Sequence, residues 1–181
     1  MELLEGIKSR RSIRRFKEEK VERCKIEQAV EAASYAPSWK NTQTTHYIVI
    51  LDAGLKNQIA EECVMDFAWN QKTIDGAPVL VVVTTQEGRC GYEKDGSFST
   101  SKGTHWQSFD AGIATQTFCL AAHELGLGTV IMGIYDEAKV KAAVGVPKGQ
   151  AVSALVAIGY PAQDPEVPNR KKVDDLVTFV E

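Results

Sequence analysis

The sequence predicts a single layered domain of the α/β or α+β class, in which helices pack against a β-sheet. Its length of 181 residues suits one ordinary domain. Hydrophobic residues make up 44% of the chain and charged residues 25%, which is the range of ordinary globular proteins. Short apolar runs typical of strands alternate with helical patterns. The sequence contains neither an internal repeat nor a low-complexity tract, so we expect residues 1–181 to form one domain.

The first part of the chain predicts two helices, a strand and a third helix. Apolar residues at helical spacing predict a short helix that ends near Arg10. A second helix is expected over residues 21–36, where a proline stops it. The apolar, partly β-branched run 47–51 predicts a buried strand. Asp52 then stands where it can cap a helix that continues to about Asn70.

The middle of the chain holds the clearest strand, Pro-Val-Leu-Val-Val-Val-Thr at residues 78–84. Residues 86–104 are rich in Gly, Ser, Thr and charges and predict a long loop, a feature that is often functional in a compact domain. Residues 106–125 predict a long helix that is apolar enough to be mostly buried. Gly126 and Gly128 end this helix.

Two more strands are predicted at residues 129–134 and 154–158, and Asp136 caps a short helix between them. A proline-rich stretch follows, and the apolar segment 173–180 comes last. That segment must be covered. It can dock on its own sheet, or it can extend across a partner subunit, which would imply an obligate dimer.

Composition restricts the classes of function and partner. With 21 basic against 24 acidic residues, the net charge of −3 suggests neither a nucleic-acid partner nor a membrane surface. The first residues do not resemble a secretory signal, and no apolar run reaches the roughly 18 residues of a transmembrane helix. We therefore expect a cytoplasmic protein. Four cysteines lie far apart, which does not favour a metal centre and suggests reduced, mostly buried thiols: Cys24, Cys63, Cys90 and Cys119.

The strongest local feature is Ser-Arg-Arg-Ser-Ile-Arg-Arg-Phe at residues 9–16, with four arginines and two hydroxyls in eight positions. Guanidinium groups match phosphate oxygens, so the segment predicts a phosphate site. The alternative is a solvated basic turn. A second source of cations, Asn-Arg-Lys-Lys at residues 169–172, follows three prolines that should hold it in place.

Two further motifs carry possible contacts to a ligand. Residues 36–43, Ala-Pro-Ser-Trp-Lys-Asn-Thr-Gln, offer hydrogen bonds to a flat polar heterocycle, or they form only a helix stop and a polar loop. In Leu-Gly-Leu-Gly-Thr, residues 125–129, the glycines allow close approach of another segment, or they form a helix cap and a bulge. This motif precedes a strand, so it does not predict a Rossmann phosphate loop.

Taken together, the motifs resemble the nitroreductase family of FMN enzymes. The match comprises the arginine segment, Ala-Pro-Ser-x-x-Asn-x-Gln, Leu-Gly-Leu-Gly-Thr, Val-Pro-Lys-Gly, and Ile-Gly-Tyr-Pro followed by a late Arg-Lys. Each motif is weak alone, but their order holds over essentially the whole chain. The resemblance implies an α+β fold, a three-layer α/β/α sandwich with a mainly antiparallel central sheet. It also implies an intertwined homodimer with FMN in the interface, in which residues 165–181 reach the partner subunit.

The resemblance also assigns contacts to the cofactor. Around the FMN phosphate it places Arg10, Arg11, Ser12 and Arg14, joined by Arg170 and Lys172. Against the flavin ring, from the other subunit, it places Pro37, Ser38, Trp39 and Asn41. Near the reactive edge it places Met132 and Gly133, and near the pyrimidine side Asn70 and Lys72. The family usually has proline and an aromatic residue where this chain has Thr44 and Thr45, and a helical excursion over the active site is reduced here to the 86–104 loop.

The implied activity is electron transfer from NAD(P)H to an oxidised organic acceptor such as a nitroaromatic or a quinone. Because the flavin performs this chemistry, we assign no catalytic side chain and no metal, and we treat His46, His105 and His123 as ordinary residues. Lys72 is expected to tune the flavin potential. Three alternatives stay open: a protein that stores or delivers flavin, an enzyme of the same fold that performs reductive dehalogenation or enone reduction, and a phosphate- or nucleotide-binding regulator without flavin.

Overall fold

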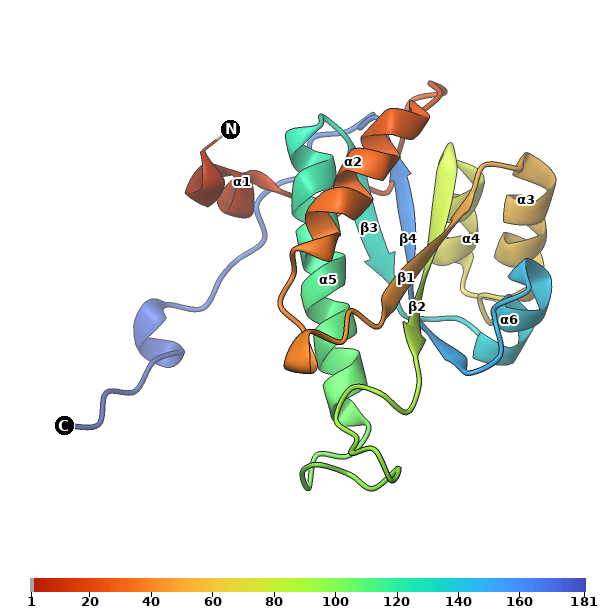
Figure 1. Ribbon diagram of the computed structural model, residues 1–181. Coiled ribbons are helices and arrows are strands. Elements are labelled where there is room, and N and C mark those ends of the chain that lie inside the picture. Colours follow the sequence, from red (N-terminus) through yellow and green to blue (C-terminus); the bar gives the residue numbers. More distant parts are fainter. Residues whose placement is uncertain (1) are drawn as a thin grey trace.

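The computed structural model describes residues 2–181, and its centre is a sheet of four antiparallel strands (Figure 1). The strands are β1 (Thr45–Ile50), β2 (Val79–Gln86), β3 (Gly128–Met132) and β4 (Gln150–Gly159). They lie in the order β1-β2-β4-β3, so β2 and β4 are central and β1 and β3 form the two edges.

Helices cover both faces of this sheet and produce three layers (Figure 1). One face carries α2 (Arg23–Ser34) and α5 (His105–Glu124), and the short α1 (Leu3–Ser9) lies beside α5. The other face carries α3 (Ala53–Glu62), α4 (Ala68–Asp75) and α6 (Glu137–Val144). The predicted α/β/α sandwich with an antiparallel sheet is confirmed.

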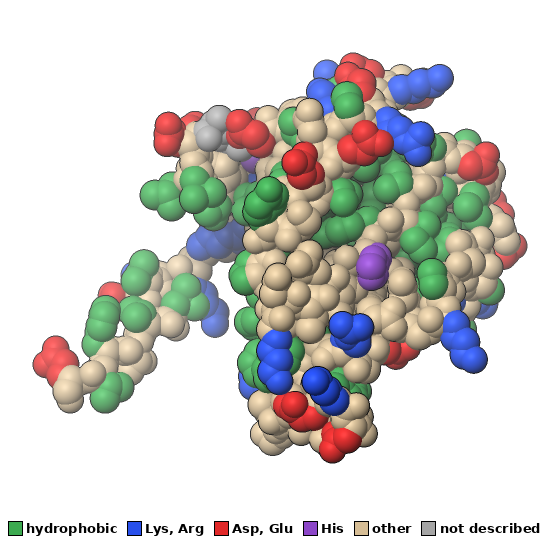
Figure 2. Space-filling model, in the orientation of Figure 1, with side chains coloured by type: hydrophobic (Ala, Val, Ile, Leu, Met, Phe, Trp, Pro, Cys, Tyr) green, Lys and Arg blue, Asp and Glu red, His purple; other side chains and the backbone are tan. Residues whose placement is uncertain are grey.

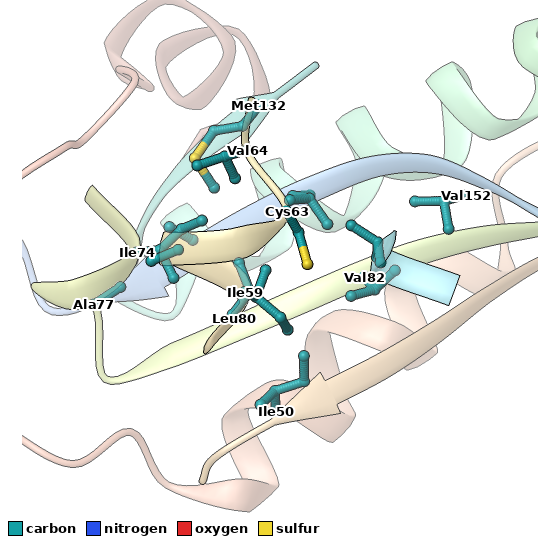
Figure 3. Close-up of a cluster of buried hydrophobic side chains, with 14 of the residues drawn as sticks. Ile50, Ile59, Cys63, Val64, Ile74, Ala77, Leu80, Val82, Met132 and Val152 are labelled. Atoms are coloured by element: carbon teal, nitrogen blue, oxygen red, sulfur yellow. The ribbon is translucent and has the colours of Figure 1, made fainter. Parts of the chain in front are cut away.

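The side chains of β2 separate the two cores. Val79, Val81 and Val83 point toward α2 and α5, where they pack with Phe118. Leu80 and Val82 point the other way, into the core beneath α3, α4 and α6 (Figure 3). Since both faces of β2 are buried, its residues 79–83 form a continuous apolar run rather than an alternating one.

Two helix starts follow the predicted capping chemistry. Leu55 N donates to Oδ1 of Asp52 at 2.7 Å at the start of α3, and Lys139 N donates to Oδ1 of Asp136 at 3.1 Å at the start of α6. Gly145, with φ of +64°, ends α6 in the left-handed conformation that glycine adopts without strain. The two predicted Asp caps are confirmed.

The helix predicted to run from Asp52 to about Asn70 is wrong in its length. The structure has two helices there, α3 and α4, because Met65 and Asp66 adopt φ values of +53° and +54°. Two consecutive left-handed residues interrupt the right-handed helix. Neither is glycine or proline, so the sequence pattern carries no signal of this break.

Other element boundaries differ less from prediction. Strand β4 begins at Gln150 rather than at residue 154, and its pairing with β2 continues past a bulge between Val83 and Thr84. Residues 87–104 form the predicted loop, which consists of turns and one bridge between Tyr92 and Phe98. Within residues 2–181, no helix combines the length and apolar character needed to cross a membrane.

Helix α5 is buried on one side only, so the prediction that most of this helix is buried is only partly confirmed. The buried residues are Asp110, Ala111, Ala114, Thr115, Phe118, Cys119 and Ala122. On the other side Phe109 is 58% exposed, and Ile113 and Leu120 are partly exposed. A long helix with apolar residues on both sides leaves one apolar face uncovered in a single chain.

The last residues do not dock on their own sheet. Residues 166–181 are exposed throughout, and Figures 1 and 2 show them extending away from the body of the molecule. Leu176, Phe179 and Val180 are 70%, 83% and 93% exposed. Docking of the segment 173–180 on its own sheet, the first of the two predicted arrangements, is therefore wrong. Its coverage by a partner subunit stays a prediction.

Candidate functional site

The arginine segment is fixed along the edge of the sheet. Ile13 N donates to Thr129 O on β3 at 2.9 Å, and Ser12 forms a parallel bridge with the same residue. Further along, Phe16 bridges to Pro161 beyond the end of β4. The backbone of the predicted phosphate segment is therefore held along the edge of the sheet.

Gly128 permits this close approach. A Cβ built on Gly128 would lie 2.6 Å from Cγ1 of Ile13 and 2.7 Å from its Cβ, closer than such atoms come in proteins. By contrast, Gly126 ends α5 with φ of +79°, and Leu127 N donates to Ala122 O at 2.8 Å. In the Leu-Gly-Leu-Gly motif, Gly126 therefore caps the helix and Gly128 allows the arginine segment to lie close to β3.

We predict that Gly128→Ala displaces the arginine segment from β3. Because Ile13 is buried and its β-branched side chain cannot swing away freely, the added methyl group should lower the free energy of unfolding by about 1–3 kcal/mol. Urea titration would measure this. Gly133→Ala is the control, since nothing lies within 4 Å of a Cβ there. Equal stability of the two variants would contradict the packing argument.

Cations from both ends of the chain line one pocket of about 280 Å³, here named the anion pocket. Its lining residues are Arg10, Arg11, Ser12, Arg14, Pro165, Glu166, Pro168 and Arg170. Four guanidinium groups face a single carboxylate, so the pocket suits a ligand group that carries more than one negative charge. Pro165 and Pro168, on either side of Glu166, also line the pocket.

The arginines of this pocket differ in what they can offer. One Nη of Arg11 donates to Lys8 O at 2.6 Å and to Arg10 O at 2.9 Å, which commits part of that side chain to shaping the turn. Nε of Arg10 is buried and has no hydrogen-bond partner within residues 2–181. An unpaired buried donor of this kind is costly unless a ligand satisfies it.

His123 lies beside the anion pocket without adding charge to it. Its Nε2 is 2.9 Å from Oγ of Ser9. Burial, and then the charges of Arg10 and Arg11, lower the pKa of His123 below its ordinary value. A pKa below the ordinary value favours the neutral imidazole near pH 7.

A second pocket of about 190 Å³, here named the ring pocket, adjoins the first because Arg14 lines both. Its other lining residues are Phe67, Trp69, Asn70, Thr73, Val130, Ile131 and Met132. Nδ2 of Asn70 donates to Ile134 O at 3.0 Å, which fixes that side chain beside the end of β3. The structure thus brings Asn70 and Met132 together with the arginine segment.

Sequence reasoning missed the two aromatic residues of the ring pocket. Trp69 is 69% exposed and Phe67 is 37% exposed. Aromatic side chains left this open at a pocket mouth suit a flat ligand or a second protein surface. Their signal in the sequence was their position just before Asn70, but the predicted continuous helix concealed it.

Some predicted site residues lie outside both pockets. Lys172 begins the short helix at Val173–Asp175, where its N donates to Oδ2 of Asp175 at 3.3 Å. Lys72 and Gly133 are exposed near the ring pocket but do not line it. These three assignments stay predictions.

The loop 37–43 also lies apart from the two pockets within one chain. Pro37 and Ser38 line a separate cavity between α2, β1 and α5, while Trp39 and Asn41 line neither the anion nor the ring pocket. A single chain therefore does not unite all the predicted contacts. Such separation is what a cofactor site shared between two subunits requires.

The loop 37–43 is strained. Lys40, Asn41 and Gln43 have φ values of +47°, +54° and +49°. Each non-glycine residue in this conformation costs about 1–3 kcal/mol, and such strain gathers at ligand-binding segments. Nε1 of Trp39 is also buried without a hydrogen-bond partner in the part of the chain described.

The cysteines and other metal-binding side chains form no cluster. Cys24 is exposed, whereas Cys63, Cys90 and Cys119 are buried and unpaired. Within residues 2–181, no three His, Cys, Asp or Glu side chains come close enough together to hold a metal ion.

Comparison with known proteins adds an independent finding. The model of the Nitroreductase family matches residues 7–160. A relative from Methanothermobacter thermautotrophicus, provisionally named an NADH dehydrogenase/NAD(P)H nitroreductase, is 31% identical over 91% of this chain and 80% of its own. Iodotyrosine deiodinase from Nematostella vectensis is 27% identical over 98% of this chain and 75% of its own.

A solved structure agrees with these matches. The FMN-dependent nitroreductase from Clostridium difficile R20291 superposes with a TM-score of 0.79 at 26% identity and covers 99% of both chains. The family match spans the arginine segment, the loop 37–43 and all four strands. The chain belongs to the nitroreductase family.

Proposed function

We propose that the protein is an FMN-dependent oxidoreductase that passes electrons from NAD(P)H to an oxidised organic acceptor, such as a nitroaromatic or a quinone. One observation carries the proposal. Arginines from the two ends of the chain line one pocket, and Arg14 joins it to a second pocket with aromatic walls. A phosphate attached to a flat ring system fits that pair of pockets.

The residues present fit FMN. The free Nε of Arg10 offers a donor to the phosphate, and Ser12 adds a neutral donor beside it. In the ring pocket, Asn70 is held with its amide at the wall, next to Met132. The named C. difficile neighbour is itself FMN-dependent, which supports the assignment.

When bound, FMN supplies the hydride chemistry, and the protein has to position it. The anion pocket would hold the phosphate tail. Lys72, which is exposed on α4, is proposed to approach the pyrimidine side and stabilise negative charge there. Gly133, exposed just beyond β3, is proposed to leave its backbone open toward the reactive edge. No side chain is required as an acid, base or nucleophile.

The working unit is proposed to be a homodimer in which each FMN site uses both chains. Three features of one chain support this. The apolar tail 173–180 is uncovered, one side of α5 is apolar and open at Phe109, and the loop 37–43 lies away from the ring pocket. A partner that covers the tail and the open side of α5 can bring its own loop 37–43 to this chain's ring pocket.

The surface also has a groove that could bind the tail of a partner subunit. A groove of about 420 Å³ lies between α2 and the edge strand β1, lined mainly by apolar side chains, and Figure 2 shows hydrophobic groups gathered over these elements. Its apolar lining consists of Ile26, Val30, Val49 and Leu51. Because β1 is an edge strand, an extended segment can lie along it.

The visible absorption spectrum of freshly purified protein, followed by anaerobic mixing with NADH and with NADPH, tests the proposal. We expect a bound-flavin spectrum that at least one reductant bleaches rapidly. A stable yellow protein that neither nicotinamide reduces would instead support the storage or delivery of flavin. A protein that takes up no FMN when the cofactor is added would refute the flavin assignment and leave a phosphate-binding regulator.

Reductive dehalogenation is the second candidate activity. The observation that favours it is the likeness to iodotyrosine deiodinase over 98% of this chain. Once the reductant is known, assaying the reduced protein with a halogenated phenol and with a nitroaromatic compound would separate the two activities. Release of halide with no reduction of the nitro compound would favour the second candidate.

A further inference from the structure

One buried carboxylate holds the backbone of the loop 37–43. Trp39 N donates to Oδ2 of Asp110 at 2.7 Å, and Sγ of Cys90 donates to the same oxygen at 3.0 Å. Asp110 is only 4% exposed, and Cys90 is fully buried. Burial, together with the bond to Asp110, raises the pKa of Cys90 to about 12, so the thiol keeps its proton and remains a donor.

Anchoring by such a bond matters because a cavity lies next to the loop. A cavity of about 300 Å³ lies under it, between α2, β1 and α5, and Asp110 lines this cavity together with Ser38 and Thr44. The positive φ values at Lys40, Asn41 and Gln43 persist only where the surroundings impose them. Hydrogen bonds within the loop impose part of this shape, because Asn41 N donates to Ser38 O at 3.0 Å and Gln43 N donates to Ser38 Oγ at 3.1 Å. The bond from Trp39 N to Asp110 then fixes the folded loop to helix α5.

Helix α5 holds the loop at two points on successive turns. Asp110 binds the backbone of Trp39, and Trp106, four residues earlier on the same helix, packs on the Trp39 ring with centroids 5.0 Å apart. The Cys90 thiol then ties the 87–104 loop to the same carboxylate. Asp110 is therefore bonded to both loops, which an exposed ion pair between Lys40 and Glu93 at 3.4 Å also joins.

We propose that Asp110 is a positioning residue for the flavin. Its carboxylate sets where the loop 37–43 stands and so where that loop meets the flavin of the partner's site. Through Cys90 the same group couples the 87–104 loop to the flavin. Asp110 acts through Trp39 and does not touch the cofactor itself. This inference rests on the proposed function, since it assumes that the loop contacts FMN.

Titration of the apo dimer with FMN tests the role, with Asp110→Ala and Asp110→Asn as the variants. Removing the carboxylate leaves the buried Cys90 thiol and the part-buried Trp39 N unpaired, so Asp110→Ala should weaken FMN binding by about tenfold or more. Asp110→Asn keeps an acceptor oxygen at the same place and should stay within about threefold of the wild-type affinity. Thr115→Val is the matched control, because it removes a buried hydroxyl of α5 that bonds only within the helix, to Ala111 O at 2.7 Å.

Visible circular dichroism at saturating FMN separates positioning from general destabilisation. The signal reports the asymmetric surroundings of the flavin ring. It should change in Asp110→Ala and keep its wild-type form in Thr115→Val, even where both variants melt earlier. Cys90→Ser, which keeps a donor, should match the wild type, whereas Cys90→Ala should shift the signal in the direction of Asp110→Ala.

The outcomes of these experiments separate the proposed function from the proposed role of Asp110. A wild-type protein that binds no FMN would refute the proposed function. A wild type that binds FMN, beside an Asp110→Ala variant with unchanged affinity and circular dichroism, would refute only the role of Asp110. If Asp110→Ala yields no folded dimer, the two Cys90 variants provide the test. Identical flavin signals in Cys90→Ala and Cys90→Ser would then overturn the proposal.

Discussion

Replacing Arg10 and Arg14 together by alanine is expected to abolish retention of FMN through purification. Both side chains line the anion pocket, and Nε of Arg10 is buried without a partner in the chain as described. A hydrogen bond to a charged group contributes about 1.5–3 kcal/mol. Loss of two should therefore raise the Kd for FMN by roughly 100-fold to 10,000-fold. Fluorescence titration of the apoprotein with FMN measures this.

The neighbouring pair Arg15 and Lys17 provides the matched control. Arg15 belongs to the same segment, and Lys17 follows its last residue directly. Both carry the same charge as the pocket arginines, but neither lines the anion pocket. Replacing both by alanine should change the Kd by less than about threefold in moderate salt, since exposed charges are screened. An equal loss of affinity in the two double variants would show that the segment acts only by its net charge, and the phosphate assignment would fail.

Riboflavin adds a second arm to this experiment. It carries the same ring as FMN but no phosphate, so it cannot use the four guanidinium groups of the anion pocket. The wild-type preference for FMN over riboflavin should therefore largely disappear in the Arg10→Ala, Arg14→Ala variant. A preference that survives the double substitution would place the phosphate elsewhere.

Local chemistry explains why much of the fold could be predicted. A strand buried on both faces needs an unbroken apolar run, which β2 has. Asp52 and Asp136 stand directly before the helices that they cap. The break between α3 and α4 escaped prediction because Met65 and Asp66 adopt left-handed conformations that their residue types do not announce.

The site was predictable in part for a related reason. Clustered arginines predict an anion site from the sequence alone, whatever the fold, and the structure places Arg170 in the same pocket. Asp110 and Trp69 escaped notice because their roles depend on tertiary contacts. The available signal for Asp110 was an acid in the interior of a largely apolar helix, whose other acid, Glu124, is its last residue. Such a residue has to find buried donors, and Trp39 and Cys90 supply them.

Deletion of residues 173–181 is expected to convert the proposed dimer into a monomer and to release FMN at the same time. Each apolar side chain of this tail that a partner buries contributes about 1.5–3 kcal/mol. Leu176, Phe179 and Val180 are at least 70% exposed in a single chain, so most of that energy can come only from another molecule. Sedimentation velocity with detection at flavin wavelengths follows both losses together.

The design separates loss of the dimer from loss of a cation. The deletion keeps Arg170, so the anion pocket of each chain retains its four arginines. Reduced FMN binding must then come from the missing partner, and raising the protein concentration should partly restore it by mass action. Removal of a phosphate contact would show no such dependence on concentration.

Paired point variants test whether the apolar character of the tail is what matters. Leu176→Asp with Phe179→Asp should reproduce the deletion, because burying two unpaired carboxylates costs far more than the contacts return. Leu176→Met with Phe179→Met keeps the apolar surface and should sediment as the wild type does. A stable monomer that still carries FMN, in any of these variants, would contradict a site built from two chains. The open side of α5 and the distant loop 37–43 would then need another explanation.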